Sequence, residues 1–133
     1  MNTAVHFSSA RTDWGTPSAV YASLDKEFGF TLDPCRLGDE GGLFGRRDGL
    51  TISWSRERVF CNPPYGPAIP DWLDRSKEAD IAVYLLPART DTRWFHDHVL
   101  RHANEVRFLR GRLRFGGSKN SAPFPSMLAI YGR

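Results

Sequence analysis

The chain has 133 residues, of which 41% are hydrophobic, 25% charged and 13% aromatic. This composition excludes a disordered or collagen-like chain, and the length is that of one domain. No apolar run approaches the roughly 20 residues of a membrane-spanning helix, and the first residues lack a basic, apolar leader, so we expect no membrane partner and a cytoplasmic location. The formal net charge of +3 indicates only a mild affinity for polyanions.

The chain begins with a predicted arm and a predicted helix. Residues 1–13 are polar and without periodicity, which predicts a flexible N-terminal arm before a single domain over residues 14–133. Pro17 suits the first position of a helix that Thr16 can cap, and Gly29 is expected to end that helix.

Two short apolar segments, residues 30–32 and 59–61, follow and predict strands. Between them, residues 36–50 hold five glycines and many charges, which predicts a loop. A helix is expected from Ile69 to about Lys77.

The rest of the chain predicts a strand, a helix and a hairpin. Residues 81–86 are continuously apolar, the pattern of a strand covered on both faces. A helix is expected over roughly 93–103, and strands over 105–115 and 126–131 should form a C-terminal β-hairpin with a long tip. Alternating strands and helices before a hairpin are typical of the α/β class, so we predict a mostly parallel sheet.

The two cysteines, Cys35 and Cys61, are 26 positions apart, outside any pairwise metal-binding spacing. We therefore expect reduced, free thiols and no metal. A zinc site that combines them with His6 or His102 is the alternative.

Arginines gather in the second half of the chain. Between residues 89 and 114, seven arginines stand against three acidic residues. The planar guanidinium suits bidentate contacts to phosphate, so this stretch favours a nucleic-acid partner, with a solvated basic face as the alternative. The candidate phosphate-binding residues are Arg89, Arg93, Arg110, Arg112, Arg114 and Lys119.

The most specific pattern is the tetrapeptide Asn62-Pro63-Pro64-Tyr65, in which a strand runs into two prolines that fix the backbone. Such a corner at the carboxyl end of a parallel strand is where α/β proteins place ligands. The Asn62 amide oxygen and the Pro63 carbonyl can accept both protons of an amino group on a planar ring, and Tyr65 can stack on that ring. The nitrogen lone pair then faces an electrophile, which is catalysis by positioning. An ordinary turn or a proline-rich peptide ligand is the alternative.

This tetrapeptide resembles the catalytic motif of S-adenosylmethionine-dependent methyltransferases that act on amino groups. The whole chain resembles the small phage and prophage DNA N-6-adenine-methyltransferase family. The matching segments run in order along the chain: Trp14-Gly15-Thr16-Pro17, residues 30–35, Asp48-Gly49-Leu50 with Trp54, residues 59–66, 85–96, 108–115 and 122–128. The resemblance implies a minimal, truncated Rossmann-like fold, a phage or prophage origin and a role in masking restriction sites.

The resemblance also implies methyl transfer from S-adenosylmethionine to N6 of an adenine flipped out of DNA. Asn62, Pro63 and Pro64 would form the corner that holds the amino group, and Tyr65 would stack on the base. No metal is needed, because the sulfonium already makes the methyl group electrophilic. The residues implied to contact the cofactor are Trp14, Thr16, Pro17, Asp33, Pro34 and Asp48.

One feature departs from the family pattern. Only 28 residues (positions 34–61) separate Asp33 from Asn62, too few for two full helix–strand units, so part of the usual cofactor-binding half is expected to be missing. Two other functions stay open: methylation of another amino or amide nitrogen (RNA adenine, cytosine N4 or protein glutamine), and non-catalytic nucleic-acid binding on a degenerate scaffold. The sequence also leaves open whether the chain forms a homodimer.

Overall fold

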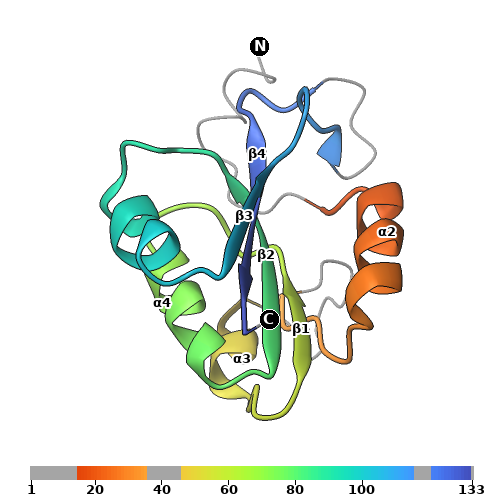
Figure 1. Cartoon of the computed structure of the whole chain (residues 1–133), viewed down its shortest axis with the longest axis vertical. Helices are drawn as coiled ribbons and strands as arrows, with labels where there is room; N and C mark the ends of the chain where they lie inside the picture. The colour runs from red at the N-terminus through yellow and green to blue at the C-terminus, as the bar shows by residue number, and fades with distance from the viewer. Residues whose placement is uncertain (1–14, 36–45, 116–120, 133) are drawn as a thin grey trace.

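The computed structural model of the protein describes residues 15–35, 46–115 and 121–132, and shows a central sheet with helices on both sides (Figure 1). This arrangement confirms the α/β class. None of the helices in these ranges is long and apolar enough to cross a bilayer. The strands are β1 (Arg58–Cys61), β2 (Ile81–Pro87), β3 (Glu105–Phe108) and β4 (Ser126–Tyr131). The helices are α2 (Ser18–Phe28), α3 (Arg46–Thr51), α4 (Ile69–Asp74), the 3-10 helix η1 (Arg75–Lys77) and the π-helix η2 (Phe95–Leu100).

The direction of β4 makes the prediction of a mostly parallel sheet wrong. The strand order is β1-β2-β4-β3, and although β1 and β2 are parallel, β4 runs antiparallel to both of its neighbours. A parallel return needs a crossover, usually a helix, whereas the described parts of the β3–β4 connection contain no α-helix. The chain therefore turns back on itself, which confirms the C-terminal β-hairpin, and the Rossmann-like arrangement is not confirmed.

Three predicted elements differ from those observed. Leu32 makes only a single parallel bridge with Val59, so residues 30–32 form no full strand. The strand expected over 105–115 ends at Phe108. Residues 46–51, most of which were expected in a loop, form α3, because close tertiary packing there outweighs the low helix propensity of glycine.

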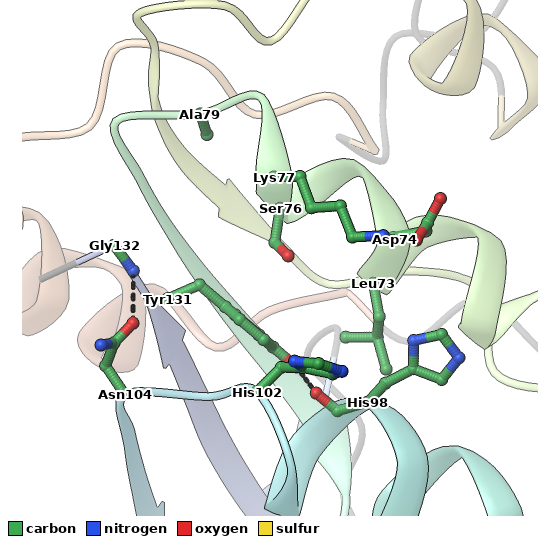
Figure 2. Close-up of a pocket in the computed structure, with 10 residues that line it drawn as sticks. All are labelled: Leu73, Asp74, Ser76, Lys77, Ala79, His98, His102, Asn104, Tyr131 and Gly132. Atoms are coloured by element: carbon green, nitrogen blue, oxygen red, sulfur yellow. Dashed lines mark hydrogen bonds and ion pairs between the residues drawn. The ribbon is translucent and has the colours of Figure 1, made fainter.

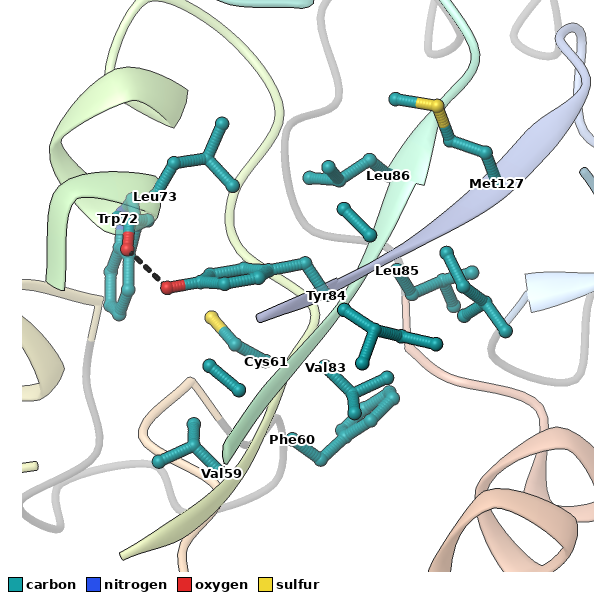
Figure 3. Packing of buried hydrophobic residues seen from close by; sticks show 14 of the residues in the cluster. Val59, Phe60, Cys61, Trp72, Leu73, Val83, Tyr84, Leu85, Leu86 and Met127 are labelled. Atoms are coloured by element: carbon teal, nitrogen blue, oxygen red, sulfur yellow. Dashed lines mark hydrogen bonds between the residues drawn. The ribbon is translucent and has the colours of Figure 1, made fainter. Parts of the chain in front are cut away.

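The core lies on both faces of the β1–β2 pair. β2 is buried along its whole length, as its apolar run predicts. On one face the Tyr84 hydroxyl donates a hydrogen bond to the Trp72 carbonyl of α4 at 2.7 Å (Figure 3). On the other face Phe60 of β1 meets Tyr21 of α2 edge to face, with ring centroids 5.2 Å apart. Helices thus cover both faces, and polar groups gather where the strands end.

The two ends of α2 are built differently. Gly29 ends the helix as predicted, with a φ of 64° and its N–H donating to the Asp25 carbonyl at 2.7 Å. At the other end Pro17 is the N-cap residue and no side chain caps the helix, so the prediction that Thr16 caps it is wrong. The Thr16 hydroxyl bonds to a different part of the chain.

Candidate active site at the carboxyl edge of the sheet

The carboxyl ends of β1, β2 and β3 lie at one edge of the sheet. β1 and β2 are parallel, and the last residues of β2 and β3, Pro87 and Phe108, lie opposite the first two residues of β4. The segments that follow the three strands therefore leave the sheet at the same end, in the upper part of Figure 1. These segments carry the Asn62–Tyr65 corner, then Arg89 and Arg93, then Arg110, Arg112 and Arg114.

Asn62 comes directly after β1 and is 8% exposed. Its Nδ2 donates a hydrogen bond to the Thr16 hydroxyl at 3.0 Å, which joins the corner to the segment before α2. Pro63 and Pro64 are buried and belong to no helix or strand. The tetrapeptide is thus a buried corner, and a hydrogen bond to a segment outside β1 holds it in place.

Tyr65 ties the same corner to β2. Its hydroxyl donates to the Leu85 carbonyl at 3.1 Å, and the side chain is 6% exposed. The ring meets Phe115 and Phe124 at steep angles, with centroid distances of 6.5 and 5.6 Å. Burial raises the pKa of the Tyr65 phenol well above its ordinary value, and Cys61 adds to this effect. Tyr65 is therefore a neutral ring within an aromatic cluster of three.

The contacts of Phe115 and Phe124 with Tyr65 are not predicted by the sequence. Phe115 and Phe124 come from the connection between β3 and β4, and the Arg89 guanidinium lies over the Phe124 ring at 5.7 Å. The sequence offers one signal for Phe124, its position between Pro123 and Pro125, which restrict the backbone on both sides of it. Its contact with Tyr65 depends on the sheet order, which no local pattern encodes.

Asp33 and Pro34, two predicted cofactor contacts, lie beside the carboxyl end of β1. The chain reaches this place because the Phe60 N–H donates to the Leu32 carbonyl at 3.0 Å. The Asp33 carboxylate accepts from the Cys35 N–H at 3.3 Å, the geometry of an Asx turn. Burial is the main cause that raises the pKa of the Cys61 thiol, and the charges of Cys35 and Asp33 raise it further. The Asp33 charge therefore acts on the end of β1.

Helix α3 packs against this turn. A β-carbon on Gly49 would stand 2.0 Å from the Pro34 carbonyl oxygen, so the two backbones are in direct contact. The contact brings the backbone of Asp48 beside the turn. The Asp48 side chain, Trp14 and Lys119 lie outside the described residues, as does the predicted arm.

One arginine of the basic stretch has a structural role. Arg107 bonds both oxygens of Glu27 at 2.8 and 2.7 Å and one oxygen of Glu105 at 2.6 Å. These hydrogen bonds raise its pKa. The five candidate phosphate-binding arginines within the described ranges are exposed instead.

A separate hollow of about 360 Å³ lies at the opposite end of the sheet (Figure 2). Its polar groups bond one another: the Tyr131 hydroxyl donates to the His98 carbonyl, and Asn104 accepts from the Gly132 N–H, both at 2.7 Å. Of the candidate site residues singled out from the sequence, only His102, a ligand of the alternative zinc site, lines it.

The structure bears on the cysteines as well. Cys35 and Cys61 are buried thiols that form no disulfide, as expected. Within the part of the chain that the structure describes, no group of three His, Cys, Asp or Glu residues could hold a metal ion. His102 lines the hollow at the far end of the sheet from Cys61, and His6 lies outside the described residues.

Comparison with known proteins agrees with the resemblance drawn from the motifs. The sequence matches a family model described as DNA N-6-adenine-methyltransferase (Dam) over residues 4–130. No curated protein and no solved structure gives a significant match. The family match spans nearly the whole chain, including the Asn62–Tyr65 corner, the Asp33 turn and the exposed arginines. The chain therefore belongs to the DNA N-6-adenine-methyltransferase (Dam) family.

Proposed function

We propose that the protein transfers a methyl group from S-adenosylmethionine to N6 of an adenine that is flipped out of DNA. Membership of the family supports DNA adenine N6 methylation in general. The observation that carries the residue assignment is the shared sheet edge, where the Asn62–Tyr65 corner, the Asp33 turn and the exposed arginines lie together.

Asn62 and Pro63 hold the amino group of the target base. The Asn62 amide oxygen and the Pro63 carbonyl accept its two N–H protons, which aims the nitrogen lone pair at the methyl donor. The corner is almost fully buried, and hydrogen bonds in such low-dielectric surroundings are stronger than in water. Bound S-adenosylmethionine would supply the methyl group with loss of its sulfur–carbon bond, and the Asn62 oxygen and the Pro63 carbonyl would hold the amino group until it releases one of its two protons.

Asp33 fits the positively charged end of the cofactor. Its carboxylate is half-buried in a rigid turn beside the carboxyl end of β1, which suits the ammonium group of a methionine moiety. When bound, the cofactor supplies an electrophilic methyl group, so Asp33 needs only to bind and orient.

Tyr65 stacks on the flipped adenine. Because its ring packs against Phe115 and Phe124, a base gains a ring face when one of these phenylalanines shifts. Base–aromatic stacking contributes about 1–3 kcal/mol, similar to the few kcal/mol that base flipping costs. Phosphate contacts from exposed arginines supply the remaining binding energy.

The direct test is Asn62→Ala. We expect the rate of N6-methyladenine formation in plasmid DNA, measured by mass spectrometry, to fall at least about 100-fold, the usual cost of losing one such positioned group. Calorimetry should show an S-adenosylmethionine affinity within about twofold of the parent protein, because Asn62 faces the base. Asn104→Ala, at the far end of the sheet, is the matched control and should keep full activity. A fully active Asn62→Ala variant would remove Asn62 from this role.

The packing of Tyr65 favours one second candidate, a non-catalytic nucleic-acid-binding protein on a methyltransferase scaffold. At 6% exposure, Tyr65 is covered without a base present. Saturable binding of S-adenosylmethionine that Asp33→Ala weakens supports the enzyme, whereas absence of binding supports the second candidate. Methylation assays run in parallel on DNA, RNA and protein substrates show whether adenine in DNA or another planar nitrogen is the methyl acceptor.

A further inference from the structure

We propose that Thr16 is a positioning residue that fixes the Asn62 amide with its oxygen toward the target amino group. The inference rests on the proposed function and deepens it. Its basis is the 3.0 Å hydrogen bond from Asn62 Nδ2 to the Thr16 hydroxyl.

Thr16 lies just before α2, where a hydroxyl commonly caps the helix. Threonine at a helix start commonly accepts a hydrogen bond from a backbone N–H of the first turn. Here α2 begins without a side-chain cap, with Pro17 at the N-cap position. The Thr16 hydroxyl is thus directed to Asn62 rather than to its own helix.

The support behind Thr16 is rigid. Pro17 limits the backbone next to it, and the Pro17 carbonyl accepts the Tyr21 N–H at 3.1 Å. Tyr21 packs on Phe60, two residues before Asn62. The same aromatic contact therefore joins α2 to β1 close to both partners of the hydrogen bond, which restrains their separation.

The chemistry explains why the orientation matters. An asparagine amide has a donor on one branch and an acceptor on the other, and a half-turn about its last torsion exchanges them. An adenine amino group presents two donors, so only the amide oxygen can receive one. With Nδ2 bonded to Thr16, the oxygen is on the branch that can face the base.

This role differs from the direct cofactor contact that the resemblance implies for Thr16. A cofactor contact predicts weaker S-adenosylmethionine binding in Thr16→Val. A positioning role predicts that Thr16→Val lowers kcat roughly 3- to 10-fold, the effect of one net hydrogen bond. Its cofactor affinity should stay within about twofold of that of the parent protein. Thr16→Ser keeps the hydroxyl and should restore most of the rate.

A double-mutant cycle isolates the orientation effect. The carboxylate in Asn62→Asp accepts on both branches, so no partner is needed to choose between them. Thr16→Val should then cost less than about twofold in the Asn62→Asp background, against roughly 3- to 10-fold in the parent protein. Equal costs in both backgrounds would overturn the positioning role.

A second measurement needs no turnover. NMR signals of the Asn62 side-chain amide can be identified by their loss in Asn62→Ala. The protons of this amide should exchange with solvent faster in Thr16→Val than in the parent protein and in Thr16→Ser. Thr31→Val, which removes hydrogen bonds to Glu57 and Arg58, is the control and should leave these signals and kcat unchanged.

The outcomes separate the two proposals. A parent protein that forms no N6-methyladenine overturns the proposed function and this inference with it. An active parent protein whose Thr16→Val variant keeps its kcat and its amide exchange overturns only the role of Thr16. A raised S-adenosylmethionine dissociation constant with unchanged kcat would assign Thr16 to the cofactor instead.

Discussion

Hydrogen bonds to distant parts of the chain hold the two polar side chains of the corner after β1. Asn62 bonds Thr16, which is 46 positions earlier, and Tyr65 bonds the Leu85 carbonyl, 20 positions later. Positioning catalysis needs groups held within about 0.5 Å of a working geometry, which supporting contacts of this kind provide.

Gly49 lies where the backbone leaves no room for a side chain. A β-carbon there would meet the Pro34 carbonyl oxygen at 2.0 Å and the Trp72 ring at 2.8 Å. The first neighbour is backbone, so relief requires α3 to move away from the turn that carries Asp33.

We therefore expect Gly49→Ala to lower the free energy of unfolding by about 1–3 kcal/mol, the usual cost of overpacking, and to weaken S-adenosylmethionine binding. Urea unfolding and calorimetry measure the two effects. Gly111→Ala is the control: its φ of 71° makes alanine strained, but nothing lies within 4 Å of the added carbon, so cofactor binding should be unaffected. A Gly49→Ala variant with unchanged stability would contradict the close contact.

At the scale of elements, Arg107 joins α2 to β3. Its guanidinium bonds Glu27 on α2 and Glu105 on β3, and lies over the Phe28 ring at 5.6 Å. Because the two carboxylates already accept hydrogen bonds from all three nitrogens of this guanidinium, few N–H donors remain for a phosphate. Of the arginines in the basic stretch, Arg107 is thus structural, whereas the five phosphate-binding candidates in the described ranges are exposed at the carboxyl edge.

This division predicts opposite effects of two sets of substitutions. Arg107→Gln should lower stability by about 1 kcal/mol, since partly exposed ion pairs contribute little each, and should leave DNA affinity unchanged. Replacing Arg110, Arg112 and Arg114 by Ala should keep stability but weaken DNA binding, and should reduce the slope of log affinity against log salt by about 0.9 per lost phosphate contact. Thermal unfolding and fluorescence anisotropy at several salt concentrations measure these effects. Weaker DNA binding in Arg107→Gln alone would contradict the assignment.

At the scale of the whole molecule, several weakly acidic side chains of the described core stay protonated. Burial raises the pKa of Cys61, Tyr65 and Tyr84 well above their ordinary values. Two of them also donate hydrogen bonds, Tyr65 to Leu85 and Tyr84 to Trp72, which ionisation would remove.

The protein should therefore lose stability in alkaline solution. Above the pKa of an unfolded thiol, about 9, the unfolded chain releases a proton that folded Cys61 retains, so the free energy of unfolding falls by up to about 1.4 kcal/mol per pH unit. The fall steepens above about pH 10, where the tyrosines of the unfolded chain ionise. Urea unfolding between pH 7 and 10.5 measures this, and Cys61→Val should remove the first part of the fall. A flat profile in the parent protein would show that these groups ionise freely in the folded state.

Local patterns were sufficient for much of the fold. The apolar run of β2 predicted burial on both faces, Gly29 predicted the end of α2, and the prolines after Asn62 predicted a rigid corner. The parallel β1–β2 pair places Arg89 at the edge that carries this corner. These features depend on side-chain periodicity and backbone restriction, which neighbouring residues express directly.

The sequence by itself determined the α/β class, the corner at Asn62–Tyr65 and the family to which the chain belongs. Only the tertiary structure decided that β4 of the hairpin inserts between β3 and β2, antiparallel to β2, that α3 packs on the Asp33 turn, and that Thr16 bonds Asn62 rather than its own helix. The physical reason is that strand direction, close backbone contacts and hydrogen bonds between distant residues arise from how elements meet in space. Propensity and periodicity report only on each element alone.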